Sequence, residues 1–224
     1  MSVGSQKCIA AKIFANLATF YSARGRADKL KYDQGDLQRA LIYIDRACDM
    51  DTGNYSHLAL RAALILTTVG WEGDPVTRDN LDKAATDLNR SLEIEPNYAA
   101  ALYNLAWVVD EQGNPGRAVN LLTKFINERE KLPRVFRGQR LIAAYINRAC
   151  ARAKGLAKDP ADPQGKRLAE ILQDCCAACE EGRESGETLY FTRIIESNSA
   201  KGEELNLLES LAPKDLRALL KWRL

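Results

Sequence analysis

Glycine and proline stand between, and seldom inside, long stretches in which apolar residues recur every three or four positions. Such spacing places apolar side chains on one face of an α-helix. In residues 8–21 that face carries Ile9, Ile13, Leu17 and Phe20. No stretch sustains the two-residue alternation of a half-buried strand, and neither Asn-Gly nor Asp-Gly occurs as a hairpin signal. The sequence therefore predicts an all-α protein.

Helix boundaries follow from the same residues, because proline is tolerated in the first turn of a helix and glycine often ends one. Pro115 and Pro213 suit first-turn positions, and Pro96 suits the end of a helix. We expect helices over residues 6–24, 36–50, 55–69, 78–94, 97–112, 115–130, 139–154, 165–181, 187–199, 203–211 and 214–222.

The charges of the chain are balanced, with 32 basic and 30 acidic residues among 224 and a formal net charge of +2. No field of one sign dominates, so nucleic acid is not an expected partner. No run of about 18 apolar residues is present, so we expect no membrane span. The apolar N-terminal positions are interrupted by Lys7, Lys12 and Asn16, unlike those of a secretory signal. We therefore expect a cytoplasmic protein.

The sequence offers no catalytic constellation. His57 is the only histidine, so a Ser-His-Asp or Cys-His system would have to use it, and no serine or cysteine near it has a recognisable motif. Neither a phosphate-binding loop that ends in Lys-Ser/Thr nor a dinucleotide-binding glycine motif occurs. We expect no enzyme activity, no catalytic residue and no cofactor.

One cysteine cluster is the only stretch that suggests a metal. Cys176 and Cys179 have Cys-x-x-Cys spacing, and Cys175 precedes them. A structural zinc ion needs four ligands, usually from two such pairs, and no second pair exists. We therefore expect no metal site and expect Cys176 and Cys179 to be buried as small packing residues at a helix contact.

Residues 97–126 form a unit of helix, turn and helix, with small and large residues at fixed offsets. The pattern consists of Pro96, Leu102, Leu105, Ala106, Val109, Gly113, Ala118, Leu121 and Leu122. This unit resembles the tetratricopeptide repeat (TPR), a helix-turn-helix family. The resemblance implies that small residues such as Ala106 and Ala118 let paired helices approach closely, while bulky residues fill the gaps between pairs.

The same unit can be laid on the rest of the chain. Equivalent positions are then Asn16, Arg61, Asn104 and Asn147, at spacings of 45, 43 and 43 residues. The family period is about 34 residues, so each unit is longer than usual. We expect repeats over residues 8–50, 55–95, 97–130 and 139–182. They would form a repeat domain over residues 1–186, followed by capping helices in residues 187–224.

The resemblance implies a right-handed α-solenoid whose first helices line a concave groove. Asparagines in that groove often hydrogen-bond the backbone of an extended peptide in this family, because an amide both donates and accepts. Lys12 with Asn16 is similar to half of the clamp that binds the C-terminal carboxylates of heat-shock chaperones, but Ala100 stands where a basic residue is expected. The candidate groove residues are Lys12, Asn16, His57, Arg61, Asn104 and Asn147. Asparagine at this position can instead bond to a local turn or a neighbouring helix, and this alternative stays open.

Two functional hypotheses follow. The first is a non-catalytic protein–protein interaction scaffold that binds a peptide or segment of a partner protein in the groove. The second is a regulatory or adaptor subunit of a larger complex. Such a subunit would dock on an enzyme through the segments inserted in the repeats and through the C-terminal helix expected over residues 214–222.

Overall fold

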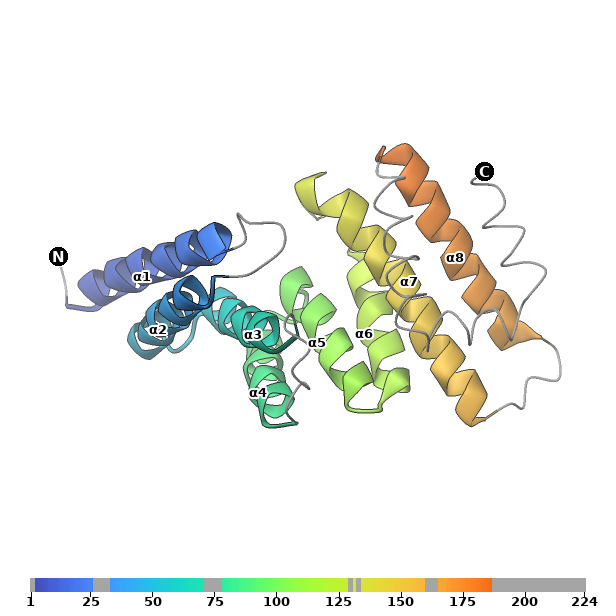
Figure 1. The fold of residues 1–224 in the computed structure, drawn as a ribbon, viewed down its shortest axis with the longest axis horizontal. Helices are drawn as coiled ribbons and strands as arrows, with labels where there is room; N and C mark the ends of the chain where they lie inside the picture. Colours follow the sequence, from blue (N-terminus) through green and yellow to red (C-terminus); the bar gives the residue numbers. More distant parts are fainter. Residues whose placement is uncertain are drawn as a thin grey trace. The chain divides into compact units, whose positions relative to one another are not determined.

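A computed structural model describes residues 3–25, 33–70, 78–128, 131, 134–159 and 165–186 (Figure 1). These residues contain eight α-helices and no strand, so the prediction of an all-α fold is confirmed. The helices are α1 (Val3–Gly25), α2 (Gln34–Met50), α3 (Tyr55–Gly70), α4 (Arg78–Ile94), α5 (Ala99–Glu111), α6 (Pro115–Asn127), α7 (Arg134–Lys158) and α8 (Lys166–Glu184).

Most of these boundaries lie within three residues of the predicted ones, and α7 differs most. It begins at Arg134 rather than at residue 139, and it continues to Lys158 through Gly155. A glycine inside a helix costs only about 1 kcal/mol relative to alanine, which the packing of a long helix readily offsets. The helices expected over residues 187–199, 203–211 and 214–222 lie outside the described residues.

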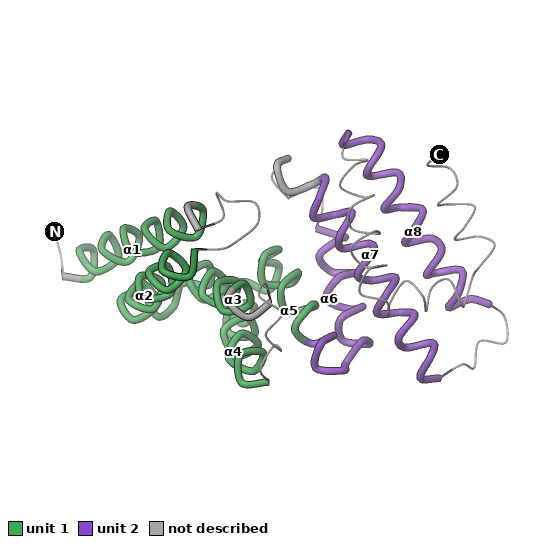
Figure 2. The backbone as a smooth tube through the Cα atoms, viewed as in Figure 1, with its two compact units in different colours: residues 1–108 green, residues 109–224 purple. Residues whose placement is uncertain are grey.

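The chain divides into two compact units, unit 1 (Met1–Val108) and unit 2 (Val109–Leu224), which Figure 2 shows in different colours. Within unit 1, α1 packs on α2, α2 packs on α3, and α3 packs on α4. Within unit 2, α6 packs on α7 and α7 packs on α8. In each of these five pairs a helix packs on the next helix in sequence.

Small residues mark one position on each odd-numbered helix. Ala18 of α1, Ala62 of α3, Ala106 of α5 and Ala149 of α7 are at most 1% exposed. They recur at intervals of 43 or 44 residues. A methyl side chain lets a neighbouring helix approach closely, so the burial of these four alanines gives the register in which the odd-numbered helices correspond.

The turn between α5 and α6 shows how local sequence sets the helix ends. Gly113 has φ of 81°, a left-handed conformation that glycine adopts without a steric cost. The side chain of Asn114 accepts a hydrogen bond from the backbone N–H of Arg117 at 3.1 Å and so caps α6. Pro115 follows in the first turn, as predicted from the sequence.

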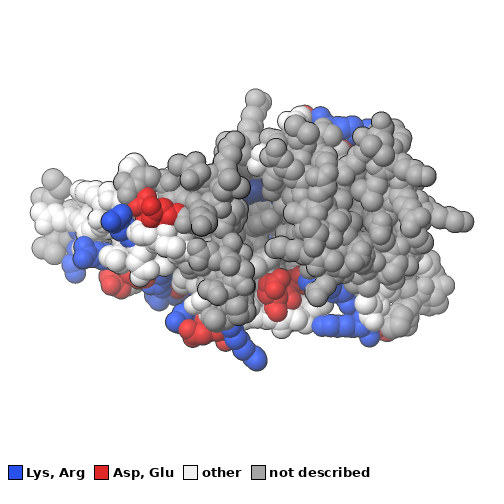
Figure 3. Space-filling model, viewed as in Figure 1, with Lys and Arg blue, Asp and Glu red and all other residues white. Residues whose placement is uncertain are grey.

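Charges of both signs are interspersed on the described part of the face that Figure 3 shows. This mixture agrees with the formal net charge of +2. None of the described helices is long and apolar enough to cross a membrane.

Candidate functional site

The structure places the four polar candidates that do not lie on α3 as follows. Lys12 and Asn16 are exposed on α1, and Asn104 of α5 and Asn147 of α7 are half-buried. Each asparagine stands two residues before a buried alanine of its helix, so the three amides hold the same position.

His57 lies near the start of α3 and is only 5% exposed. The carboxamide of Asn54 accepts hydrogen bonds from the backbone N–H groups of Ser56 and His57, at 3.1 and 3.4 Å, and thereby caps the helix. Burial lowers the pKa of the imidazole, although Asp51 and the Ala47 carbonyl favour its charged form. The side chain is therefore part of the core at its contact with the end of α2.

Arg61 is half-buried, and its guanidinium is bound by a carboxylate of α4. Its Nε and Nη2 donate to the two carboxylate oxygens of Asp87 at 2.7 and 2.6 Å, and Nη1 lies 3.4 Å from Asp45 of α2. The hydrogen bonds and charge of Asp87 raise the pKa of Arg61 above its usual range. A paired, two-pronged contact of this kind fixes both side chains in place.

The burial of Ala62 also shifts the register on α3 by one residue from the alignment made on sequence. Leu60, two residues before Ala62, corresponds to Asn16, and Arg61 takes the next position. Two successive alanines follow Arg61, and only the first is fully buried, so the sequence alone allowed either register.

Arg148 of α7 takes the position of Arg61, and its contacts reproduce those of Arg61. Its Nε and Nη2 donate to Asp174 of α8 at 3.1 and 2.5 Å, and Nη1 donates to Thr123 of α6 at 3.0 Å. In both pairs the aspartate follows the arginine by 26 residues. The pairs therefore form one recurring contact between an odd-numbered helix and the even-numbered helix after it.

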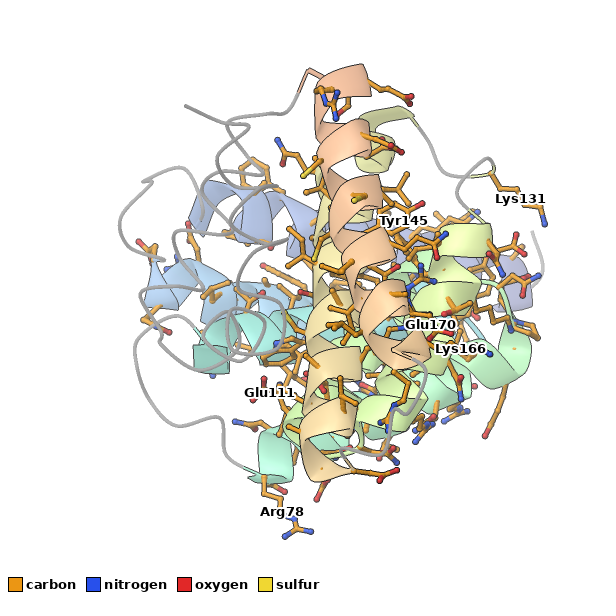
Figure 4. All side chains as sticks on the ribbon, turned by 90° about the vertical axis from the view of Figure 1, so that its right-hand side faces the viewer. Arg78, Glu111, Lys131, Tyr145, Lys166 and Glu170 are labelled. Atoms are coloured by element: carbon orange, nitrogen blue, oxygen red, sulfur yellow. The ribbon has the colours of Figure 1, made fainter. Side chains whose placement is uncertain are left out.

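A second arginine shares the buried carboxylate of Asp174. Arg152 Nη1 donates to Asp174 at 2.5 Å, and its Nε lies 3.6 Å from Glu170. The guanidinium of Arg148 also lies over the ring of Tyr145, 5.7 Å from its centroid. Figure 4 labels Tyr145 and Glu170, which lie to one side of α8 in that view.

Sequence reasoning missed these ion pairs, although a signal was present. At the positions of Arg61 and Arg148, the helices α1 and α5 carry Leu17 and Leu105. Asp87 stands three residues after the buried Ala84, and three residues after the buried Ala40 and Ala118 the helices α2 and α6 carry Tyr43 and Leu121. In each helix pair, therefore, either an arginine on the odd-numbered helix faces an aspartate on the even-numbered helix, or both positions are uncharged.

The cysteines of unit 2 lie mainly in the core between α7 and α8. Cys150 is buried, and Cys175 and Cys179 pack against its cluster while half-buried. Cys176 is also half-buried, so the expectation that Cys176 and Cys179 are fully buried was wrong. Burial, together with the charge of Asp174, raises the pKa of Cys175 to about 12, which keeps this thiol neutral and unreactive.

Potential metal ligands do not gather in the described part of the chain. No three side chains of His, Cys, Asp or Glu come together there in a way that would hold a metal ion.

In unit 1, burial raises the pKa of Cys48 to about 11, so this thiol also stays protonated.

Solved structures with a similar fold are known, whereas sequence comparison gives no relative. No protein-family model matches the sequence, and no curated protein matches it with significance. YrrB, described as a TPR protein with an unusual peptide-binding site, aligns over 94% of this chain and 91% of its own, with TM-score 0.52 and 16% identity. The chain has a TPR-like fold. The MamA protein aligns with this TPR-like chain over 78% of it and 75% of its own length, with TM-score 0.51 and 18% identity.

Proposed function

We propose that this protein is a non-catalytic interaction scaffold that binds an extended segment of a partner protein through its odd-numbered helices. The observation that carries the proposal is the recurrence of asparagine at one position, as Asn16, Asn104 and Asn147. An amide side chain donates to a peptide carbonyl and accepts from a peptide N–H, so it suits a ligand read by its backbone. The peptide-binding site named for YrrB supports the same class of ligand.

Lys12 adds a charge to this proposed site. Lys12 is exposed one turn before Asn16, and its long, flexible side chain can extend to a carboxylate of the partner. We do not propose that Arg61 or His57 contacts the ligand. The guanidinium of Arg61 is bound by Asp87, and the side chain of His57 is buried. The residues proposed to contact a ligand are therefore Lys12, Asn16 and Asn104 in unit 1 and, separately, Asn147 in unit 2.

To test the proposal, a random peptide library is displayed on phage, and a peptide that binds the immobilised full chain is selected. Its affinity is then measured by fluorescence anisotropy for Asn16→Ala, Asn104→Ala and Asn147→Ala. A lost hydrogen bond costs about 1 kcal/mol, so each variant should bind about fivefold more weakly. Asn120→Ala, at an exposed position of α6, is the matched control and should bind as the unaltered protein does.

Circular dichroism and the melting temperature establish that each variant keeps its fold. If all three variants bind the peptide unchanged while folded, the asparagines are not the binding surface. A role as an adaptor subunit that docks through other segments would then be the better hypothesis.

A further inference from the structure

One position of the odd-numbered helices is buried in every case except α1. It carries His57 in α3, Ala101 in α5 and Ala144 in α7, and all three side chains are buried. In α1 the same position carries Ile13, which is 54% exposed. The largest apolar side chain of the set is therefore the one that faces solvent.

A second position, two turns further along, shows the same contrast. Leu64 of α3, Val108 of α5 and Ala151 of α7 are at most 1% exposed. Phe20 of α1, at the corresponding position, is 56% exposed. Ile9, one turn before Ile13, is 48% exposed and extends the surface. We call Ile9, Ile13 and Phe20 the α1 apolar face.

Unit 1 itself shows which kind of element covers this position. On α3 the covering element is the helix before it, because Leu64, the counterpart of Phe20, belongs to one buried cluster with Ile44 and Ala47 of α2. The α1 apolar face presents to solvent the surface that α3 presents to α2. Its shape is therefore suited to an α-helix that carries an apolar stripe.

Basic side chains border the α1 apolar face. Lys12 is exposed beside Ile13, and α1 contains no acidic residue. The guanidinium of Arg46 from α2 lies 5.7 Å from the centroid of the ring of Phe14, which follows Ile13 in the sequence. Charge complementarity therefore favours a helix with acidic residues beside its apolar stripe.

The same charges argue against a second copy of this chain as the occupant. Two α1 helices packed face to face would bring together Lys7 and Lys12 of both copies, with no carboxylate on either helix to compensate. Like charges placed opposite one another raise the free energy of such a contact.

We propose that the α1 apolar face docks an amphipathic α-helix of a partner protein, with acidic residues of that helix facing Lys12 and Arg46. The contact is the counterpart of the α2–α3 contact inside unit 1. On α1 this surface overlaps the proposed peptide site, because Lys12 belongs to both and Asn16 stands three residues after Ile13. Asn104 and Asn147 belong to other helices, α5 and α7, so these two residues distinguish the two proposals.

The test uses two synthetic peptides of 17 residues, the length of α2, that keep the apolar residues which α2 buries. One peptide has Glu at the flanking positions and the other has Lys. Binding of each fluorescently labelled peptide to the full chain is followed by anisotropy at low and high salt. We expect the Glu peptide to bind at least tenfold more tightly than the Lys peptide, with an affinity that falls as salt is added.

Two double variants identify the surface. Ile13→Ser with Phe20→Ser should weaken binding of the Glu peptide at least tenfold, whereas Ile94→Ser, at an exposed apolar residue of α4, should leave it unchanged. Lys12→Glu with Arg46→Glu should reverse the preference between the two peptides. All these substitutions are at exposed positions, so the helical circular dichroism spectrum should not change.

Three results would overturn the proposal. The first is failure of the full chain to bind the Glu peptide, and the second is binding that survives Ile13→Ser with Phe20→Ser. The third is a dimer of the unaltered chain, measured by light scattering, that this double variant abolishes, because the occupant is then a second copy. Asn104→Ala with Asn147→Ala should leave the Glu peptide's affinity unchanged, so this test and that of the proposed function fail independently.

Discussion

The guanidinium of Arg61 on α3 binds both carboxylate oxygens of Asp87 on α4, at 2.7 Å from Nε and 2.6 Å from Nη2. Arg61→Leu leaves the carboxylate of Asp87 in the core without this partner, which should cost about 3 kcal/mol of unfolding free energy. Arg61→Leu combined with Asp87→Leu should restore stability to within about 1 kcal/mol, because an apolar pair replaces the ion pair. Urea unfolding of the double-mutant cycle measures the coupling. Additive effects of the two changes would contradict this account.

Asp174 should matter more to stability than either of its arginine partners. Asp174→Leu leaves the side chains of Arg148 and Arg152 without a carboxylate that both bind, and we expect a loss of about 3 kcal/mol or more. Arg148→Leu leaves Asp174 paired with Arg152 and should cost clearly less. Chemical denaturation of the two variants decides the order, and an equal loss would show that Arg152 does not compensate.

Gly113 and Gly116 offer a matched pair of glycine substitutions in and after one turn. At neither position would an added Cβ meet another atom within 4 Å, so only backbone conformation distinguishes them. Gly113→Ala should destabilise the protein by about 1–2 kcal/mol, because its φ of 81° disfavours a side chain. Gly116→Ala, in the first turn of α6, should stabilise it by about 0.5 kcal/mol. Thermal melting of both variants checks the opposite signs.

His57 should make the protein less stable in mild acid. Because burial lowers its pKa in the folded state, the unfolded chain binds the proton more tightly. The contribution of His57 is thus complete above the unfolded pKa of 6.5 and is lost as pH falls through its folded pKa. The urea concentration at the unfolding midpoint should therefore fall further between pH 7.5 and pH 5 for the unaltered protein than for His57→Gln. Parallel pH profiles of the two proteins would rule out this role.

Helix positions were predictable from the sequence because they depend on local spacing and on glycine and proline. The extent of α7 was not, because Gly155 is an ordinary stop signal that packing overrides here. The Arg61 register was also beyond the sequence, since burial alone distinguishes Ala62 from Ala63.

Sequence reasoning likewise could not identify the exposed face of α1. Ile13 and Phe20 have the spacing of core residues, and only the three-dimensional arrangement shows that more than half of each is exposed. The recurrence of asparagine on three of the four described odd-numbered helices was visible in the sequence, because side chains of one type recur at a nearly constant interval, and its role in binding stays a prediction.

Because Arg61 on α3 pairs with Asp87 on α4, these two helices have to be moved together when helices of the array are exchanged. A chimera that put α3 in the place of α1 would set an arginine against Tyr43 of α2, and α7 in that place would do the same. Moving both helices of a pair together transfers the counter-charge as well. Protein engineers who lengthen or shuffle this array should therefore cut before α3 and after α4, and never at the α3–α4 connection.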